Sequence, residues 1–253
     1  MTRMSMIKVK NLVKMFGLKT ILKGMNFDVE PGEFVAFLGP NGAGKTTFLR
    51  ILSSLSMPSF GDVKVAGYQL PQHAAAVRSK LGVLSHQPLL YGDLTAEENL
   101  EFFGRMYNVN DLGKRIDEML EVVGLSKRRG DLVRTFSRGM QQRLAIGRAV
   151  VHNPEILLLD EPYTGLDQDA SGILDDVLRT IASEGRTVIM TSHDLVRTED
   201  MASRFDVLSK GKVIASTNKK NISKNGLLAF YRDAIERSKI EEEEKKRDRK
   251  NKK

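Results

Sequence analysis

The sequence has no cysteine among its 253 residues, which excludes a disulfide framework and any metal site built on thiolates. It also has no apolar run near the roughly 18 residues that a membrane-spanning helix needs. No long apolar stretch follows residues 1–6, so we expect no signal peptide. The chain is long enough for one large or two small domains with a substantial core. These absences are compatible with a cytosolic protein.

The chain carries an excess of basic residues, with a formal net charge of +8. Such a charge indicates anionic neighbours, for example a nucleotide, an acidic lipid or a nucleic acid. Part of it is concentrated in residues 245–253, so it says little about the folded body.

A glycine-rich run near the N-terminus matches the phosphate-binding pattern G-x-x-x-x-G-K-[ST]. The run consists of Gly39, Pro40, Asn41, Gly42, Ala43, Gly44, Lys45 and Thr46, and is followed by Thr47. A short apolar strand is expected before it, at 33–38, and a helix after it, at 47–52, as the motif requires. Backbone N–H groups of such a loop surround phosphate oxygens, the lysine adds positive charge, and the Thr46 hydroxyl can bind Mg²⁺. We therefore expect this loop to bind a nucleoside triphosphate.

Two carboxylates follow a second apolar run at 156–159. Four aliphatic residues are typical of a buried strand in a parallel sheet, where ligands gather at the carboxyl ends of the strands. Asp160 at that end can hold Mg²⁺, directly or through water, as in P-loop NTPases. Glu161 can orient or deprotonate the water that attacks the γ-phosphate.

The remaining patterns predict an α/β body that a mostly helical insert interrupts at about 88–152. Thr95 and Glu98 form a capping box at the start of one helix, and Gly124 ends a second helix that covers 116–123. A third helix is expected at 141–151. Strands are expected at 7–12, 25–29, 62–67, 81–85, 188–191 and 205–208.

The last residues differ in composition from the body. A helix is expected to start at 227–231, and acidic and basic side chains at 241–247 recur at i, i+4, which supports a solvated helix. A frayed charged tail is the alternative, because this sequence cannot bury a core. Binding of the basic end to an anionic membrane surface is a further hypothesis. Vesicle binding that is unchanged after deletion of 241–253 would exclude it.

The segment at 136–143 lies between the two nucleotide motifs and resembles the signature motif of the ATP-binding-cassette (ABC) ATPases, Leu-Ser-Gly-Gly-Gln. Ser137 and Gly139 match the serine and the second glycine of the signature, whereas Phe136, Arg138 and Met140 depart from it. Ser137 is expected to cap the following helix, whose positive end can bind a γ-phosphate. The departures affect contacts through signature side chains and leave the backbone contacts intact.

Other positions match the same family in the same order, over about residues 6–215. Gln87 is similar to the Q-loop glutamine, which contacts Mg²⁺ and the attacking water. The run 163–167 is similar to the D-loop, and His193 to the switch histidine that contacts the γ-phosphate. Phe16 takes the place of the aromatic residue that stacks on adenine, which is usually tyrosine.

The resemblance implies a RecA-like P-loop core with an N-terminal antiparallel β subdomain and an inserted helical subdomain. It implies a nucleotide-binding domain at 1–218, with a charged extension at 219–253. ATP and Mg²⁺ would be the cofactors, with Thr46, Gln87 and Asp160 at the metal and Glu161 as catalytic base. Two cassettes, in a homodimer, would pack head to tail so that each ATP lies between the P-loop of one chain and Ser137 of the other.

The family also implies polytopic membrane subunits as partners and a location at the cytoplasmic face of the cell membrane. The surface at 86–93, the signature and the run 163–167 look most like the haem-exporter ATPase of cytochrome c maturation. Cassettes of drug, lipid or polysaccharide exporters share much of this pattern. Two alternatives stay open: a soluble cassette ATPase acting on nucleic acid or ribosomes, although no nucleic-acid partner is expected, and a nucleotide-binding module without hydrolysis.

Overall fold

The computed structural model describes residues 5–85, 87–222 and 226–251, which form two sheets with helices around them. The central sheet has six strands in the order β10-β9-β3-β8-β7-β6. Their bounds are Phe34–Leu38 for β3, Leu81–Leu84 for β6, Ile156–Asp160 for β7, Thr187–Thr191 for β8, Arg204–Ser209 for β9 and Lys212–Asn218 for β10. All neighbours are parallel except β9 and β10.

The second sheet is antiparallel and has the order β2-β1-β4-β5. It comprises β1 (Ile7–Phe16), β2 (Lys19–Val29), β4 (Phe60–Val65) and β5 (Tyr68–Leu70). Strand β4 begins two residues earlier than the sequence pattern indicates, because Phe60 pairs with Val13 of β1. The alternation of apolar and polar residues along β1 is that of a sheet with one buried face.

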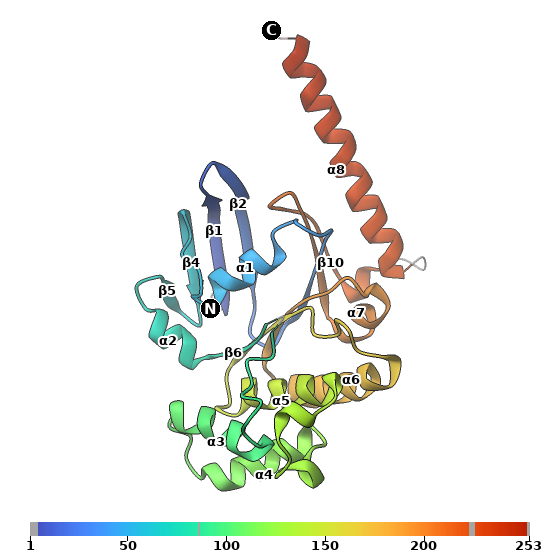
Figure 1. The fold of residues 1–253 in the computed structure, drawn as a ribbon. Coiled ribbons are helices and arrows are strands. Elements are labelled where there is room, and N and C mark those ends of the chain that lie inside the picture. The colour runs from blue at the N-terminus through green and yellow to red at the C-terminus, as the bar shows by residue number, and fades with distance from the viewer. Residues whose placement is uncertain (1–4, 86, 223–225, 252–253) are drawn as a thin grey trace.

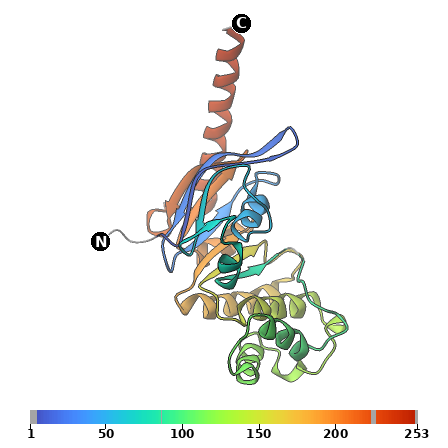
Figure 2. The ribbon, with the colours of Figure 1, turned by 90° about the vertical axis from the view of Figure 1, so that its left-hand side faces the viewer.

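Helices lie on both sides of the central sheet and at one end of the molecule. Their bounds are Lys45–Leu52 for α1, Ala74–Ser79 for α2, Ala96–Met106 for α3, Leu112–Val122 for α4, Arg138–Val150 for α5, Gln168–Ser183 for α6, Leu195–Met201 for α7 and Gly226–Asn251 for α8, with short 3₁₀ turns at Ser126–Arg128, Val133–Thr135 and Lys219–Asn221. Figure 2 shows α8 projecting from the body at the end opposite to the helices between β6 and β7. The α/β class with an antiparallel subdomain and an inserted set of helices is confirmed.

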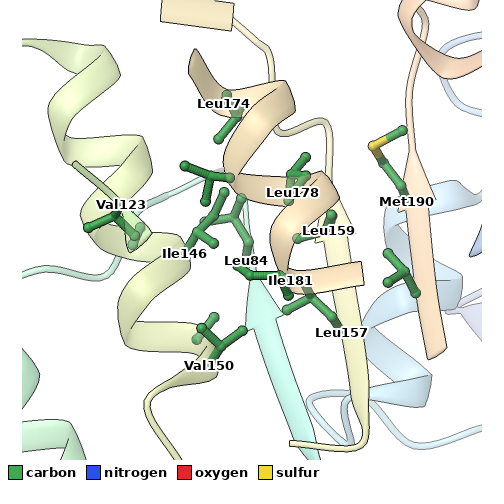
Figure 3. Packing of buried hydrophobic residues seen from close by; sticks show 14 of the residues in the cluster. Leu84, Val123, Ile146, Val150, Leu157, Leu159, Leu174, Leu178, Ile181 and Met190 are labelled. Carbon is green, nitrogen blue, oxygen red and sulfur yellow. The ribbon is translucent and has the colours of Figure 1, made fainter. Parts of the chain in front are cut away.

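The central strands bury both faces, as their continuous apolar runs predict. In β7, Leu157 and Leu159 face one cluster, whereas Ile156 and Leu158 face the other. Figure 3 shows the first cluster, in which residues of α5 and α6, such as Ile146 and Leu178, meet the strands. This packing fixes the start of α5, with its signature residues, relative to the end of β7.

The second cluster lies between the two sheets and around α1. Phe27, Phe37 and Phe48 form a trio of rings with centroids 5.1–5.3 Å apart. Aromatic pairs at these distances add favourable energy to the burial of their area. Because Phe48 belongs to α1 and Phe37 to β3, the trio anchors both elements that flank the glycine-rich loop.

Candidate active site

The glycine-rich loop joins the end of β3 to the start of α1 with a backbone that needs glycine. Gly39, Gly42 and Gly44 have φ angles of 152°, 76° and 112°. A Cβ atom on Gly39 would lie 2.2 Å from the carbonyl oxygen of Leu208. Gly44 is the N-cap of α1 and offers no side-chain acceptor, and the first turn of the helix has no acidic residue. The first N–H groups of α1 are therefore available to an anion, at the positive end of the helix.

Lys45 is the buried cation of this site. Its side chain is 7% exposed, and its Nζ donates to the Gly39 carbonyl oxygen at 2.7 Å. The same Nζ lies 3.6 Å from Glu161 Oε1. The lysine thus links the loop to the carboxylate that follows β7, and it can exchange these partners for phosphate oxygens.

The two nucleotide motifs meet at a pair of oxygen-bearing side chains. Thr46 Oγ1 donates to Asp160 Oδ1 at 3.2 Å, although the two residues are 114 positions apart in the sequence. Thr191 Oγ1, at the end of the neighbouring strand β8, donates to the same oxygen at 2.7 Å. A hydroxyl and a carboxylate are the hard oxygen ligands that Mg²⁺ uses beside phosphates and water, so the residues fit this ion. Sequence reasoning did not single out Thr191, because a threonine at a strand end carries no signal by itself.

Glu161 and His193 form a hydrogen-bonded pair at the carboxyl ends of β7 and β8. The Nδ1 atom of His193 lies 2.7 Å from Glu161 Oε2. The Glu161 backbone has φ 52°, and its N–H donates to the hydroxyl of Thr191 at 3.0 Å. The carboxylate is 19% exposed and the imidazole 70%, so solvent reaches the pair. A carboxylate held in this way can accept a proton from a water molecule.

The predicted Q-loop glutamine, Gln87, lies on the segment that follows β6. Gln87 is exposed, and its backbone carbonyl oxygen accepts a hydrogen bond from the Ser85 hydroxyl at 2.7 Å. Among the described residues its side chain has no hydrogen bond to the glycine-rich loop, Asp160 or Glu161. His86, from the predicted Q-loop surface, lies outside the described residues.

The signature residues Ser137 and Gly139 lie at the start of α5, in a different part of the molecule from α1 (Figure 1). Ser137 Oγ accepts from the N–H of Met140 at 3.3 Å, as the expected N-cap. For this reason α5 begins three residues before the start that the apolar pattern indicates. Gly139 packs against α6, where an added Cβ would lie 2.8 Å from the Ala170 side chain.

Phe16 ends β1 with its ring half exposed, at 55%. The ammonium group of Lys14 lies 4.7 Å from the centroid of this ring and also donates to the carbonyl oxygen of Met57 at 2.8 Å. A cation over an aromatic face is an attractive contact. The ring is thus held by Lys14 while part of its surface remains open for stacking.

A patch of large apolar side chains is exposed beside the helices that follow β6. Leu89, Tyr91, Phe102 and Met106 are 54%, 50%, 40% and 63% exposed. The ring of Tyr91 lies 5.0 Å from that of Phe102 and 6.2 Å from that of Phe103. The exposed rings of Tyr91 and Phe102 thus lie together, and contiguous exposed apolar surface is typical of interaction sites. Among the described residues, no helix is both long and apolar enough to cross a bilayer.

Comparison with known proteins gives consistent matches. The family profile described as ABC transporter matches residues 22–164. The linearmycin resistance ATP-binding protein LnrL of Bacillus subtilis is 38% identical over 219 residues, which cover 86% of this chain and 70% of that protein. The Nod factor export ATP-binding protein I of Ralstonia nicotianae is 36% identical over 211 residues, or 83% of this chain and 66% of that protein.

Solved structures agree with this result. A structure described as the ATP-binding subunit of an ABC transporter superposes with a TM-score of 0.82 and 27% identity, and covers 91% of this chain and 99% of its own. The ATP-binding cassette MJ0796, described as a dimer in a post-hydrolysis state with ADP and Pi, gives a TM-score of 0.74 and 30% identity, with coverage of 85% and 99%.

Proposed function

The chain belongs to the ABC transporter family of ATP-hydrolysing cassettes, and from this we propose that it supplies the energy for a membrane exporter. The observation that carries the proposal is the convergence of Lys45, Asp160, Glu161 and His193 at one edge of the central sheet. The exposed apolar patch around Tyr91 and Phe102 adds a surface for a partner.

The site residues divide between holding the nucleotide and hydrolysing it. The adenine stacks on Phe16, and the triphosphate lies in the loop 39–46 and along the first turn of α1, including Thr47. Thr46, Asp160 and Gln87 would hold Mg²⁺, which neutralises charge on the β- and γ-phosphates when bound. Glu161 takes a proton from the attacking water, and His193 orients the carboxylate of Glu161 and reaches the γ-phosphate.

A second copy of the chain completes each site. Ser137 and Gly139 lie away from the glycine-rich loop of their own chain, so they can reach phosphates only on a partner. In the proposed homodimer the γ-phosphate bridges two positive surfaces, the loop of one copy and the start of α5 of the other. Loss of the γ-phosphate removes the bridge and weakens the interface.

The apolar patch is the proposed docking surface for polytopic membrane subunits, and we propose the cytoplasmic face of the membrane as the location of the protein. Three close aromatic rings provide a large, rigid contact area. A ribosome or nucleic acid would instead need a basic surface, so this alternative is less well supported at this patch.

The direction of transport is proposed from the relatives. The Ralstonia protein is named for Nod factor export, which favours export, and the name of LnrL, linearmycin resistance, is compatible with it. Haem is one candidate cargo, on the resemblance of the signature and Q-loop segments alone. Neither name mentions haem, so an exporter of another molecule, such as a drug, lipid or polysaccharide, is the alternative.

The test is co-purification from membranes of cells that produce the chain with its natural partners. We expect a polytopic membrane protein to co-purify with the wild type, and Phe102→Ser to reduce its recovery at least fivefold. Phe60→Ser is the matched control, since Phe60 is 66% exposed on the antiparallel sheet, away from this patch. Recovery of nucleic acid in place of a membrane protein would contradict the proposal.

A further inference from the structure

Two loops carry the hydrolytic pair, and each leaves the central sheet from a neighbouring strand. Asp160 of β7 pairs with Thr191 of β8, so Glu161 and His193 begin segments that leave the same edge of the sheet. The first segment runs through residues 162–167 into α6, and the second runs through Asp194 into α7. The distance between Glu161 and His193 therefore depends on what holds these segments together.

A hydrogen-bonded network joins the two segments behind the pair. The Tyr163 hydroxyl donates to Asp175 Oδ1 at 2.7 Å, and Arg197 Nη1 donates to Asp175 Oδ2 at 2.7 Å. Arg197 Nε also lies 3.4 Å from Asp194 Oδ2. Arg197 thus connects the residue next to His193 with Asp175 of α6, and Asp175 connects it to the residue two positions after Glu161.

The network is shielded from solvent more than an ordinary surface ion pair. The side chains of Asp175 and Arg197 are 13% and 22% exposed. The Arg197 guanidinium lies 5.8 Å from the centre of the Tyr163 ring. Burial, together with the hydrogen bond to Asp175, raises the pKa of Tyr163 far above its usual value, so the hydroxyl remains a donor. Shielded, hydrogen-bonded ion pairs hold a fixed geometry, whereas exposed ion pairs contribute little to stability.

We propose that Arg197 is a positioning residue for ATP hydrolysis. Through Asp175, Tyr163 and Asp194 it maintains the distance and orientation of Glu161 relative to His193. Three members of the network, Tyr163, Asp194 and Arg197, line a hollow of about 330 Å³ together with Glu161 and His193. This inference rests on the roles proposed for Glu161 and His193. A small displacement of a catalytic group lowers the rate of the chemical step much more than it lowers substrate binding.

The test compares the ATPase kinetics of Arg197→Met and Tyr163→Phe with those of the wild type. We expect each variant to lose about tenfold or more in kcat, with KM and the affinity for a non-hydrolysable ATP analogue within about twofold of the wild type. The double variant should lose no more than the stronger single variant, because both substitutions break one network. Arg179→Met is the matched control, since Arg179 lies on α6, is 55% exposed and pairs with Asp176 at 3.3 Å.

The outcomes separate positioning from general stability. If Arg197→Met is unstable in thermal unfolding, Tyr163→Phe still decides, because it removes only the hydroxyl. A kcat equal to that of Arg179→Met in both variants, or losses that add in the double variant, would overturn the proposal. Near-normal hydrolysis by Glu161→Gln in the same assay would instead refute the role of Glu161 on which the inference rests.

Discussion

Glu161 of the site has a backbone conformation that is unfavourable for most residues, and its carboxylate follows directly after that of Asp160. Glu161 has φ 52°, a region that few residues other than glycine adopt, and two contacts with Thr191 stabilise it there. Strain of this kind is found at functional sites. The left-handed turn at Glu161 immediately follows Asp160, so the two adjacent carboxylates serve different partners: Thr46 and Thr191 for the first, and Lys45 and His193 for the second.

A half-buried histidine outside the site, His152, predicts a dependence of stability on pH. His152 stacks on Tyr107 with ring centroids 3.8 Å apart, and its Nε2 contacts the Leu81 carbonyl oxygen at 3.0 Å. Burial, with the nearby Arg148, Arg115 and Arg186, lowers the pKa of His152 from 6.5 to about 4. Between these values the unfolded chain binds a proton that the folded chain does not. Stability should therefore fall as the pH is lowered from about 6.5 to about 4.

Urea unfolding at several pH values measures this effect. The loss attributable to His152 is on the order of 2 to 3 kcal/mol over this window, and His152→Phe, which keeps a ring beside Tyr107, should show a fall that is smaller by this amount. His73→Phe is the control, because His73 is exposed. Equal acid sensitivity of the His152→Phe variant and the wild type would contradict the assignment.

The sequence was informative at the residue scale wherever a motif keeps its members adjacent. The loop 39–46 and the Asp160–Glu161 pair were predicted from such runs, and the structure places them in contact. Arg197 and Thr191 were missed, because their partners become neighbours only through the pairing of β7 with β8. A strand-end threonine or an arginine on a short helix has no distinctive local pattern.

At the scale of elements, the sequence predicted where helices start, but it did not predict which strands pair in the sheets. Ser137 and Thr95 cap α5 and α3 as their side-chain chemistry predicts. The strand order β10-β9-β3-β8-β7-β6 has no local signal, since buried parallel strands have similar apolar sequences. Helix α6 was not predicted, although Leu174, Val177, Leu178 and Ile181 have helical spacing and are all buried.

The capping box of α3 gives a prediction for the element that carries Phe102. Thr95 Oγ1 accepts from the Glu98 N–H at 3.1 Å, and Glu98 Oε2 accepts from the Thr95 N–H at 2.7 Å. Thr95→Ala removes one of these bonds and should lower the free energy of unfolding by about 1 kcal/mol.

Urea unfolding also provides the control for this prediction. Thr180→Ala, in the exposed interior of α6, should change the free energy of unfolding by less than about 0.5 kcal/mol. Equal effects of the two substitutions would show that the cap contributes nothing specific to α3.

At the scale of the whole molecule, the two halves of the proposed ATP site lie on different parts of one chain. The glycine-rich loop adjoins the antiparallel sheet through the Phe27, Phe37 and Phe48 trio, whereas Ser137 starts a helix that packs with α3, α4 and α6. This separation is visible in Figure 1 and is the physical reason for proposing a head-to-tail dimer. In the proposed dimer, association should depend on the nucleotide, because phosphate charge would join the two positive surfaces.

The proposal that ATP is held between two copies of the chain is tested most directly by the molar mass of Glu161→Gln in solution. Light scattering measures this mass with and without Mg-ATP. Slow hydrolysis in this variant should preserve the γ-phosphate, so we expect a dimer with Mg-ATP and a monomer with ADP or without nucleotide. Adding Lys45→Ala to the same variant should restore the monomer. A mass that stays monomeric while ATP is bound, or a dimer that forms equally without ATP, would contradict the claim that the nucleotide is held between two copies.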